Sequence, residues 1–152
     1  MGLPEVRVRK ALPSDLNAVK SLADDNKSYL GFVLRPVLAA GIERGWLLVA
    51  EMADYVIVGF ANYRHRRDEQ TTLYEICVDQ AFRGQGLGRA LIASLAIECA
   101  ALGKAKICLR TPTDIPANDF YRALGFRLAT TEPGKHKQLN LWTGNVVELS
   151  RQ

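Results

Sequence analysis

Three glycines in the stretch RGQGLGRALIASL, which begins at Arg83, are the first sign of a binding site. They follow the run TTLYEICV and lead into an apolar segment, so the pattern is typical of a strand, a glycine-rich loop and a helix. Such a loop points several backbone N–H groups at one spot, with the positive end of the helix dipole behind them. The stretch therefore predicts an anion site, and phosphate or pyrophosphate is its natural ligand.

The spacing of these glycines excludes two other phosphate loops. The dinucleotide fingerprint G-x-G-x-x-G, counted from Gly84 and Gly86, would need its third glycine where Arg89 stands. The triphosphate loop G-x-x-x-x-G-K-[ST] would need its second glycine at Arg89 and its lysine at Ala90. A tight strand-to-helix turn that needs positive φ remains as a purely structural alternative.

Residues 83–88, RGQGLG, resemble the R/Q-x-x-G-x-G/A signature of the GNAT superfamily, the acyl-CoA-dependent N-acetyltransferases. The preceding ICVD and the later FYRALGF resemble that family's other two landmarks, at the expected separations. The resemblance implies acetyl-CoA (coenzyme A) as cosubstrate. It also implies transfer of the acetyl group, by direct attack, to a primary amine of an amino-acid-like small molecule or of a peptide. A non-catalytic acyl-CoA binding or sensing module is the alternative.

The resemblance implies that coenzyme A is held mainly by the backbone. Amides of the loop and of the helix start would hold the pyrophosphate, and the strand before the loop would pair with the pantetheine arm. A bulge in that strand would aim the Val78 amide at the thioester carbonyl as an oxyanion donor. The predicted coenzyme-binding residues of this segment are Ile76, Cys77, Val78, Arg83, Gly84, Gln85, Gly86, Leu87, Gly88 and Arg89.

Two side chains are candidates for the proton transfers that this chemistry needs. Tyr121 matches the family's tyrosine in Y-x-x-x-G-F and would give a proton to the departing thiolate. Glu75, on the strand before the loop, is either the base for the amine or a solvated strand carboxylate. Some relatives place a carboxylate at the position of Cys108 for this part, and its absence here leaves Glu75, a water relay or no dedicated base. We interpret Cys77 as a packing residue rather than as an acyl carrier.

Further contacts are predicted on the coenzyme side and on the acceptor side. The family commonly has an asparagine seven residues before its tyrosine, where Asp114 stands here. Either Asp114 caps the following helix and contacts the coenzyme differently, or the nearby Asn118 has taken over. On the acceptor side, SYLGFVLRPVL would supply an apolar wall and one anion-holding charge, which favours an amino acid or a peptide terminus. Its candidate residues are Tyr29, Phe32 and Arg35.

The elements that must position these residues follow from hydrophobic periodicity and turn signals. Strands are predicted at 6–10, 46–52, 55–66, 71–78, 106–111, 126–131 and 138–143, and helices at 12–25, 36–45, 88–102 and 117–124. This order is that of a mixed α/β fold. The resemblance implies a largely antiparallel central sheet flanked by helices, the GNAT-like N-acyltransferase fold, with residues 1–152 as a single domain.

Composition argues against several other classes of protein. The 152 residues are 48% hydrophobic and 24% charged, as in an ordinary soluble domain. No apolar run approaches the ~18 residues that span a bilayer, and the N-terminus lacks a signal-peptide layout, so we expect a cytoplasmic protein without membrane contact. A net charge of +4 is no nucleic-acid signature, and three isolated cysteines with two histidines predict no metal site. Small members of the resembled family often form homodimers.

Overall fold

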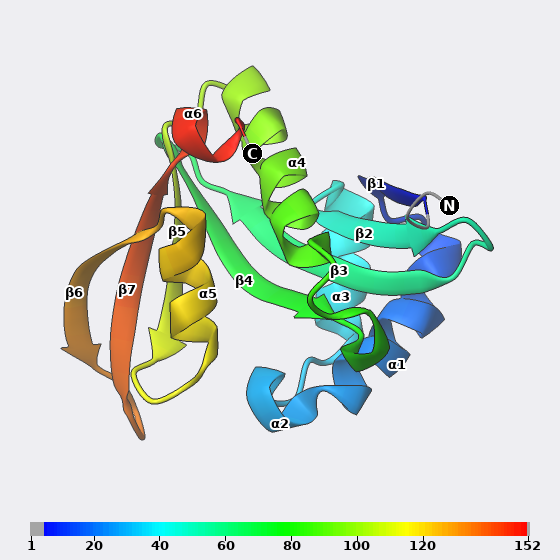
Figure 1. Cartoon of the computed structure of the whole chain (residues 1–152), viewed down its shortest axis with the longest axis horizontal. Helices are drawn as coiled ribbons and strands as arrows, with labels where there is room; N and C mark the ends of the chain where they lie inside the picture. Colours follow the sequence, from blue (N-terminus) through cyan, green and yellow to red (C-terminus); the bar gives the residue numbers. More distant parts are fainter. Residues whose placement is uncertain (1–4, 152) are drawn as a thin grey trace.

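The computed structural model describes residues 5–151, which form seven strands and six α-helices (Figure 1). The strands are β1 (Val6–Lys10), β2 (Leu47–Met52), β3 (Ile57–His65), β4 (Gln70–Val78), β5 (Lys106–Pro112), β6 (Arg127–Pro133) and β7 (Gln138–Asn145). The helices are α1 (Leu16–Asp25), α2 (Lys27–Leu30), α3 (Arg35–Arg44), α4 (Leu87–Ala101), α5 (Ala117–Leu124) and α6 (Val146–Leu149), with 3-10 turns at Pro13–Asp15 and Gln80–Phe82. All the predicted strands and helices are present, and α2 and α6 are additions. No helix in this range is long and apolar enough to cross a membrane.

All seven strands belong to one sheet, in the order β1-β2-β3-β4-β5-β7-β6. Neighbouring strands are antiparallel except for β4 and β5, which are parallel. Parallel neighbours need a crossover connection, and α4 supplies it. The prediction of a mixed, largely antiparallel sheet flanked by helices is therefore confirmed.

Helices cover both faces of the sheet, and each face has its own hydrophobic cluster. Beneath α1 and α3, the sheet contributes Leu47, Val49 and Phe60. Beneath α4 and α5, it contributes residues such as Leu48 and Ala50. Figure 1 shows α4 and α5 on one face of the sheet, with α3 behind it. A strand buried on both faces needs apolar residues at successive positions, which explains the unbroken run LLVA in β2.

One extra residue interrupts the pairing of β3 with β4. Asn62 of β3 pairs with Glu75, but the next β3 residue, Tyr63, pairs with Leu73. Tyr74 therefore has no partner on β3 and forms a β-bulge. The resemblance implied a bulge at the end of this strand, near Val78. The structure places the bulge four residues earlier, at Tyr74.

The bulge reverses the faces to which the later residues of β4 point. Leu73 packs in the cluster beneath α4, and so do Ile76 and Val78. Cys77 packs in the opposite cluster, beneath α1 and α3. Because side chains alternate along a strand, Glu75 points to the same face as Cys77. Without the extra residue, Glu75 would share the face of Leu73.

Past the bulge, β4 and β5 no longer pair. Their described pairs run over three positions and end with Thr72 opposite Cys108. Figure 1 shows the ends of β4 and β5 apart from one another, with α5 in front of β5. The sheet is therefore split along part of its length, and β4 has one edge without a neighbouring strand there.

A buried polar cluster ties α4 to the first half of the sheet. Glu98 of α4 accepts a hydrogen bond from the Tyr63 hydroxyl at 2.8 Å and forms an ion pair with Lys10. Its Oε2 atom also lies 2.7 Å from Nε2 of His65, whose Nδ1 is 2.7 Å from Oγ1 of Thr71. Burial acts to raise the pKa of Glu98, but hydrogen bonds from His65, Lys10 and Tyr63 outweigh it and lower the pKa to about 2. The carboxylate is therefore ionised at neutral pH.

We expect Glu98→Gln to lower the free energy of unfolding at neutral pH by about 1–3 kcal/mol, because an amide cannot pair with the Lys10 ammonium. The folded pKa of Glu98 lies below its ordinary value of 4.5, so its stabilising effect is complete above that pH and is lost as the pH falls toward about 2. The difference between wild type and variant should shrink across this window. Urea unfolding at several pH values measures it, and a difference that stays constant would contradict the assignment.

Candidate active site

The glycine-rich loop between β4 and α4 holds its backbone in a left-handed conformation at two points. Gly84 has a φ of 78° and Gly86 a φ of 83°, and a side chain at either position would meet no atom within 4 Å. These glycines are needed for backbone conformation rather than for close contact. Gln85 is exposed between them, and α4 begins at Leu87. The first turn of a helix leaves N–H groups without intrahelical partners, so the loop and helix start fit an anion such as pyrophosphate.

Gly88, in the first turn of α4, has a different reason to be glycine. A Cβ atom there would lie 2.9 Å from Cζ and 3.1 Å from Cε1 of Phe120. Real Cβ atoms do not come that close to a ring, so Phe120 of α5 packs directly on the backbone of α4. This contact joins the two helices that cover the divided part of the sheet.

The two arginines of the loop have different surroundings. Arg83 donates from Nε to the Val78 carbonyl at 3.2 Å and from Nη2 to Oδ1 of Asn26 at 2.8 Å. Asn26 is buried at the junction of α1 and α2, where its amide donates to the Leu22 carbonyl at 2.9 Å. Arg83 therefore fastens the loop to β4 and to the α1–α2 junction, a role that the sequence did not predict. Arg89 lies exposed in the first turn of α4.

The end of β4 directs two backbone amides away from β3. The Asp79 N–H donates to the Val58 carbonyl at 2.8 Å, next to the last described pair of β3 and β4. Because N–H groups alternate in direction along an antiparallel strand, those of Ile76 and Val78 point to the other side. The Val78 carbonyl, which accepts from Arg83, points there too. No described strand pairs with this stretch, so these groups fit the backbone-like amides of an extended ligand.

Tyr121 lies among aromatic rings in the cluster beneath α4 and α5. Its side chain is 6% exposed, and the ring centres of Phe120, Phe126 and Trp142 lie 5.3, 5.6 and 6.5 Å away. Burial raises the pKa of the phenol above its ordinary range. Because its pKa is raised, the hydroxyl stays protonated at neutral pH. No described group hydrogen-bonds to it.

Glu75 lies on the opposite face of the sheet from Tyr121, beside Asn62. Nδ2 of Asn62 donates to Oε2 of Glu75 at 3.0 Å. Burial raises the pKa of Glu75, while the hydrogen bond from Asn62 acts to lower it. This half-buried, hydrogen-bonded carboxylate differs from a solvated strand carboxylate. Its neighbour Cys77 is 5% exposed, and burial, with the nearby Asp79 and Asp25, raises the pKa of its thiol to about 12, which favours packing over nucleophilic chemistry.

Asn118 is the centre of a buried hydrogen-bond network rather than an open contact for a coenzyme. Its Oδ1 accepts from Oγ1 of Thr111 at 2.5 Å, Nε1 of Trp142 at 3.0 Å and Nδ2 of Asn140 at 3.2 Å. Its Nδ2 donates to three carbonyls of the loop before α5, at 2.9 to 3.3 Å. Both polar ends of the side chain are taken up inside the protein, so we do not retain Asn118 as a coenzyme contact.

Asp114 does not cap α5 as the sequence analysis proposed. The cap position is held by Pro116, and no side chain accepts a hydrogen bond from the first turn. The Asp114 carboxylate is exposed and instead pairs at 3.4 Å with Lys137, in the hairpin between β6 and β7. It joins that hairpin to the loop before α5.

Two of the predicted acceptor residues, Phe32 and Arg35, have exposed side chains. Phe32 is 84% exposed and belongs to neither hydrophobic cluster. Arg35 is exposed and donates to Oδ1 of Asn17 at 2.7 Å. Tyr29 lies in α2, and its side chain falls outside the described part of the structure. The acceptor wall formed by these three residues stays a prediction.

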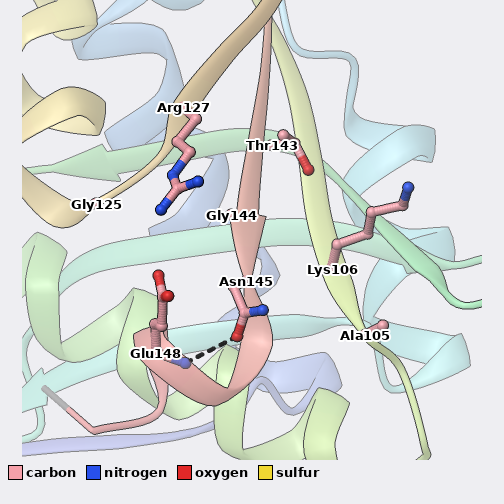
Figure 2. A pocket seen from close by; sticks show the side chains of 8 residues that line it. All are labelled: Ala105, Lys106, Gly125, Arg127, Thr143, Gly144, Asn145 and Glu148. Atoms are coloured by element: carbon pink, nitrogen blue, oxygen red, sulfur yellow. Dashed lines mark hydrogen bonds between the residues drawn. The ribbon is translucent and has the colours of Figure 1, made fainter.

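A shallow pocket of about 300 Å³ lies elsewhere, at the start of β5 and the end of β7 (Figure 2). Figure 2 shows the side chains of Arg127 and Glu148 pointing toward one another in it. None of the predicted site residues lines this pocket, so it is separate from the loop and from Tyr121. Within residues 5–151, no group of three His, Cys, Asp or Glu side chains is placed to bind a metal ion.

The chain is similar in sequence to a known family and in fold to solved structures. Residues 43–128 match the family model described as "Acetyltransferase (GNAT) domain". The chain is 32% identical over 126 residues to the 5-NmdU N-acetyltransferase of Pseudomonas phage PaMx11, covering 80% of this chain and 87% of that protein. Ard1 from Thermoplasma volcanium matches with a TM-score of 0.82 at 19% identity, over 92% of this chain and 97% of its own. The PaiA N-acetyltransferase from Thermoplasma acidophilum, solved with coenzyme A, matches with a TM-score of 0.78 at 16% identity, over 93% and 99%.

We expect Asn118→Ala to lower the free energy of unfolding by about 2–4 kcal/mol, because it leaves the buried Thr111 hydroxyl and the Asn140 amide without their shared acceptor. Asp114→Ala, which removes only an exposed ion pair, should change it by less than about 1 kcal/mol. Urea unfolding of the two variants against wild type measures the contrast. Equal and small effects would show that the Asn118 network does not support the fold.

Proposed function

The chain belongs to the GNAT acetyltransferase family and is an acetyl-CoA-dependent acetyltransferase, and we propose that it acetylates a primary amine of a small molecule or a peptide by direct attack. One observation carries the proposal: Glu75 and Tyr121 lie on opposite faces of the sheet, at the part where β4 and β5 have separated. An amine that enters on the Glu75 side meets a base. A thiolate that leaves on the Tyr121 side meets an acid.

Backbone groups of this chain would hold the donor. Acetyl-CoA supplies an acetyl thioester and an anionic pyrophosphate. The amides of residues 83–88 and the start of α4 would bind the pyrophosphate, and Arg89 adds positive charge beside them. The outward N–H of Ile76 and the carbonyl of Val78 would pair with the extended arm, leaving the Val78 N–H to stabilise the oxyanion. The left-handed Gly84 and Gly86, and the absence of a described strand along this edge of β4, support this role.

Glu75 and Tyr121 would carry the two proton transfers. Glu75 takes a proton from the alkyl ammonium, directly or through water, and the free amine attacks the thioester carbonyl to form the C–N bond and a tetrahedral oxyanion. As the oxyanion collapses, the C–S bond breaks and Tyr121 gives its proton to the departing sulfur. The proton that the new amide nitrogen releases restores Tyr121 through water. Burial raises the pKa of Glu75 toward the range in which a base is effective at neutral pH. Burial also keeps Tyr121 protonated until the thiolate appears.

A thiol-release screen tests the proposed reaction. Acetyl-CoA is offered with amino acids, peptides, polyamines and aminoglycosides, together with 5-NmdU because one relative is named for acetylating it. We expect free thiol to appear with at least one amine and an acetylated product of matching mass. Binding of acetyl-CoA without thiol release across the whole panel would favour a non-catalytic coenzyme A-binding module.

We expect Tyr121→Phe to lower kcat by about 100-fold or more, because the ring still packs but the proton donor is gone. Acetyl-CoA binding should remain close to that of wild type, since backbone groups hold the donor. Thiol release and titration calorimetry measure the two quantities. Tyr55→Phe is the matched control, because Tyr55 is 83% exposed in the turn between β2 and β3. An unchanged kcat in Tyr121→Phe would remove the general-acid assignment.

A further inference from the structure

Asn62 of β3 is a buried polar residue whose amide is committed to Glu75. Asn62 is only 4% exposed, and its Nδ2 donates to Oε2 of Glu75 at 3.0 Å. The two residues are also direct partners in the β3–β4 register. Among the described residues, Asn62 is the one side chain that donates a hydrogen bond to this carboxylate. The other carboxylate oxygen, Oε1, is left for a ligand.

Gly41 of α3 leaves the space that the Asn62 side chain occupies. A Cβ atom at Gly41 would lie 2.7 Å from Oδ1 of Asn62 and 3.6 Å from its Cγ. The backbone of Gly41 is ordinary helix, so no left-handed conformation calls for glycine here. Glycine is also less favourable than alanine inside a helix. The close approach of Asn62 is therefore the structural reason for a glycine at this position.

Among the residues on the same face of the sheet as Glu75, Asn62 is its principal polar neighbour. On β4 itself, Cys77 points to the same face, and burial keeps its thiol neutral by raising its pKa to about 12. Asp25 of α1 and Asp79 act on Cys77, whereas the pKa of Glu75 is raised by burial and opposed only by Asn62. On β5, Cys108 alternates with the buried Ile107 and so points to the Glu75 face, where it contacts Thr143. From α3, Gly41 brings no charge.

We propose that Asn62 is a positioning residue for Glu75 in acyl transfer, and that Gly41 is required because it leaves room for Asn62. The inference rests on the proposed function, in which Glu75 is the base. Asn62 fixes one carboxylate oxygen and favours the ionised form, so that the other oxygen faces the incoming ammonium. Neither residue touches the reacting atoms.

The test compares Asn62→Ala with Gly41→Ala in the full chain, using an amine identified by the thiol-release screen. Each variant should lower kcat at neutral pH by about 10-fold while the KM for acetyl-CoA stays near the wild-type value. The acidic limb of the kcat/KM profile should move to higher pH, because Glu75 loses the hydrogen bond that lowers its pKa. In Gly41→Ala the new Cβ displaces Asn62, so the double variant should match Asn62→Ala alone.

Asn140→Ala is the matched control, because Asn140 is another buried strand asparagine but donates to Asn118 instead. It should lose stability while its acidic limb stays in place. Gly41→Ala also covers a failure of Asn62→Ala to fold, since alanine favours the helix. An acidic limb that stays in place in both Gly41→Ala and Asn62→Ala overturns the proposal.

Glu75→Gln separates this outcome from a failure of the proposed function. If Glu75→Gln keeps wild-type turnover and pH profile, Glu75 is not the base and both assignments fall together. If Glu75→Gln removes the acidic limb but the Asn62 and Gly41 variants leave it unmoved, only the positioning role falls. A carbon NMR titration of the Glu75 carboxyl in the free protein gives a readout independent of turnover; its midpoint should rise in Asn62→Ala.

Discussion

The unpaired Tyr74 in β4 is the constraint on which the rest of the site depends. A single extra residue sends Glu75 and Cys77 to one face of the sheet and Ile76 and Val78 to the other. Just before it, the pairing with β5 ends, and the amides beyond it have no strand to bind. The main-chain groups that we propose for the donor and the carboxylate that we propose for the acceptor therefore come from the same few residues, pointing in different directions.

A divided sheet needs an anchor on each side of the division, because β4 and β5 share few ladder hydrogen bonds. On the β1–β4 side, the carboxylate of Glu98 binds Lys10, Tyr63 and His65, and so joins α4 to β1 and β3. On the β5–β7 side, Asn118 joins α5 to β5 and β7. Asn118 is buried and Glu98 is partly buried, and the hydrogen bonds of both have fixed geometry, whereas the shared hydrophobic cluster is less directional. Each half of the sheet carries one catalytic candidate: Glu75 lies on β4, and Tyr121 lies on α5.

Much of the fold could be predicted from sequence because its signals are local. Gly45, Gly103 and Gly125 end helices in left-handed conformation, and Gly84 and Gly86 shape the loop, so element order and loop position followed from spacing. The direction of Glu75 could not be predicted, because nothing in TTLYEICV marks which residue is the extra one. Asn118 was a candidate for the coenzyme because it is an asparagine close to position 114, but its partners Thr111 and Trp142 are brought to it only by the sheet. The helix α6 is too short to show a periodic hydrophobic pattern. The exposure of Phe32 could not be predicted either, because residue type alone does not show whether a phenylalanine is buried.

The contact of Phe120 with Gly88 links α5 to α4 across the divided part of the sheet. Beyond Thr72 and Cys108 no ladder fixes the spacing of β4 and β5, so it is fixed by the helices that rest on them. The width of the gap between β4 and β5 then depends on how closely the Phe120 ring packs against the turn of α4 at Gly88. A different side chain at Phe120 could change that width without altering any residue that we propose to bind the donor or to move a proton.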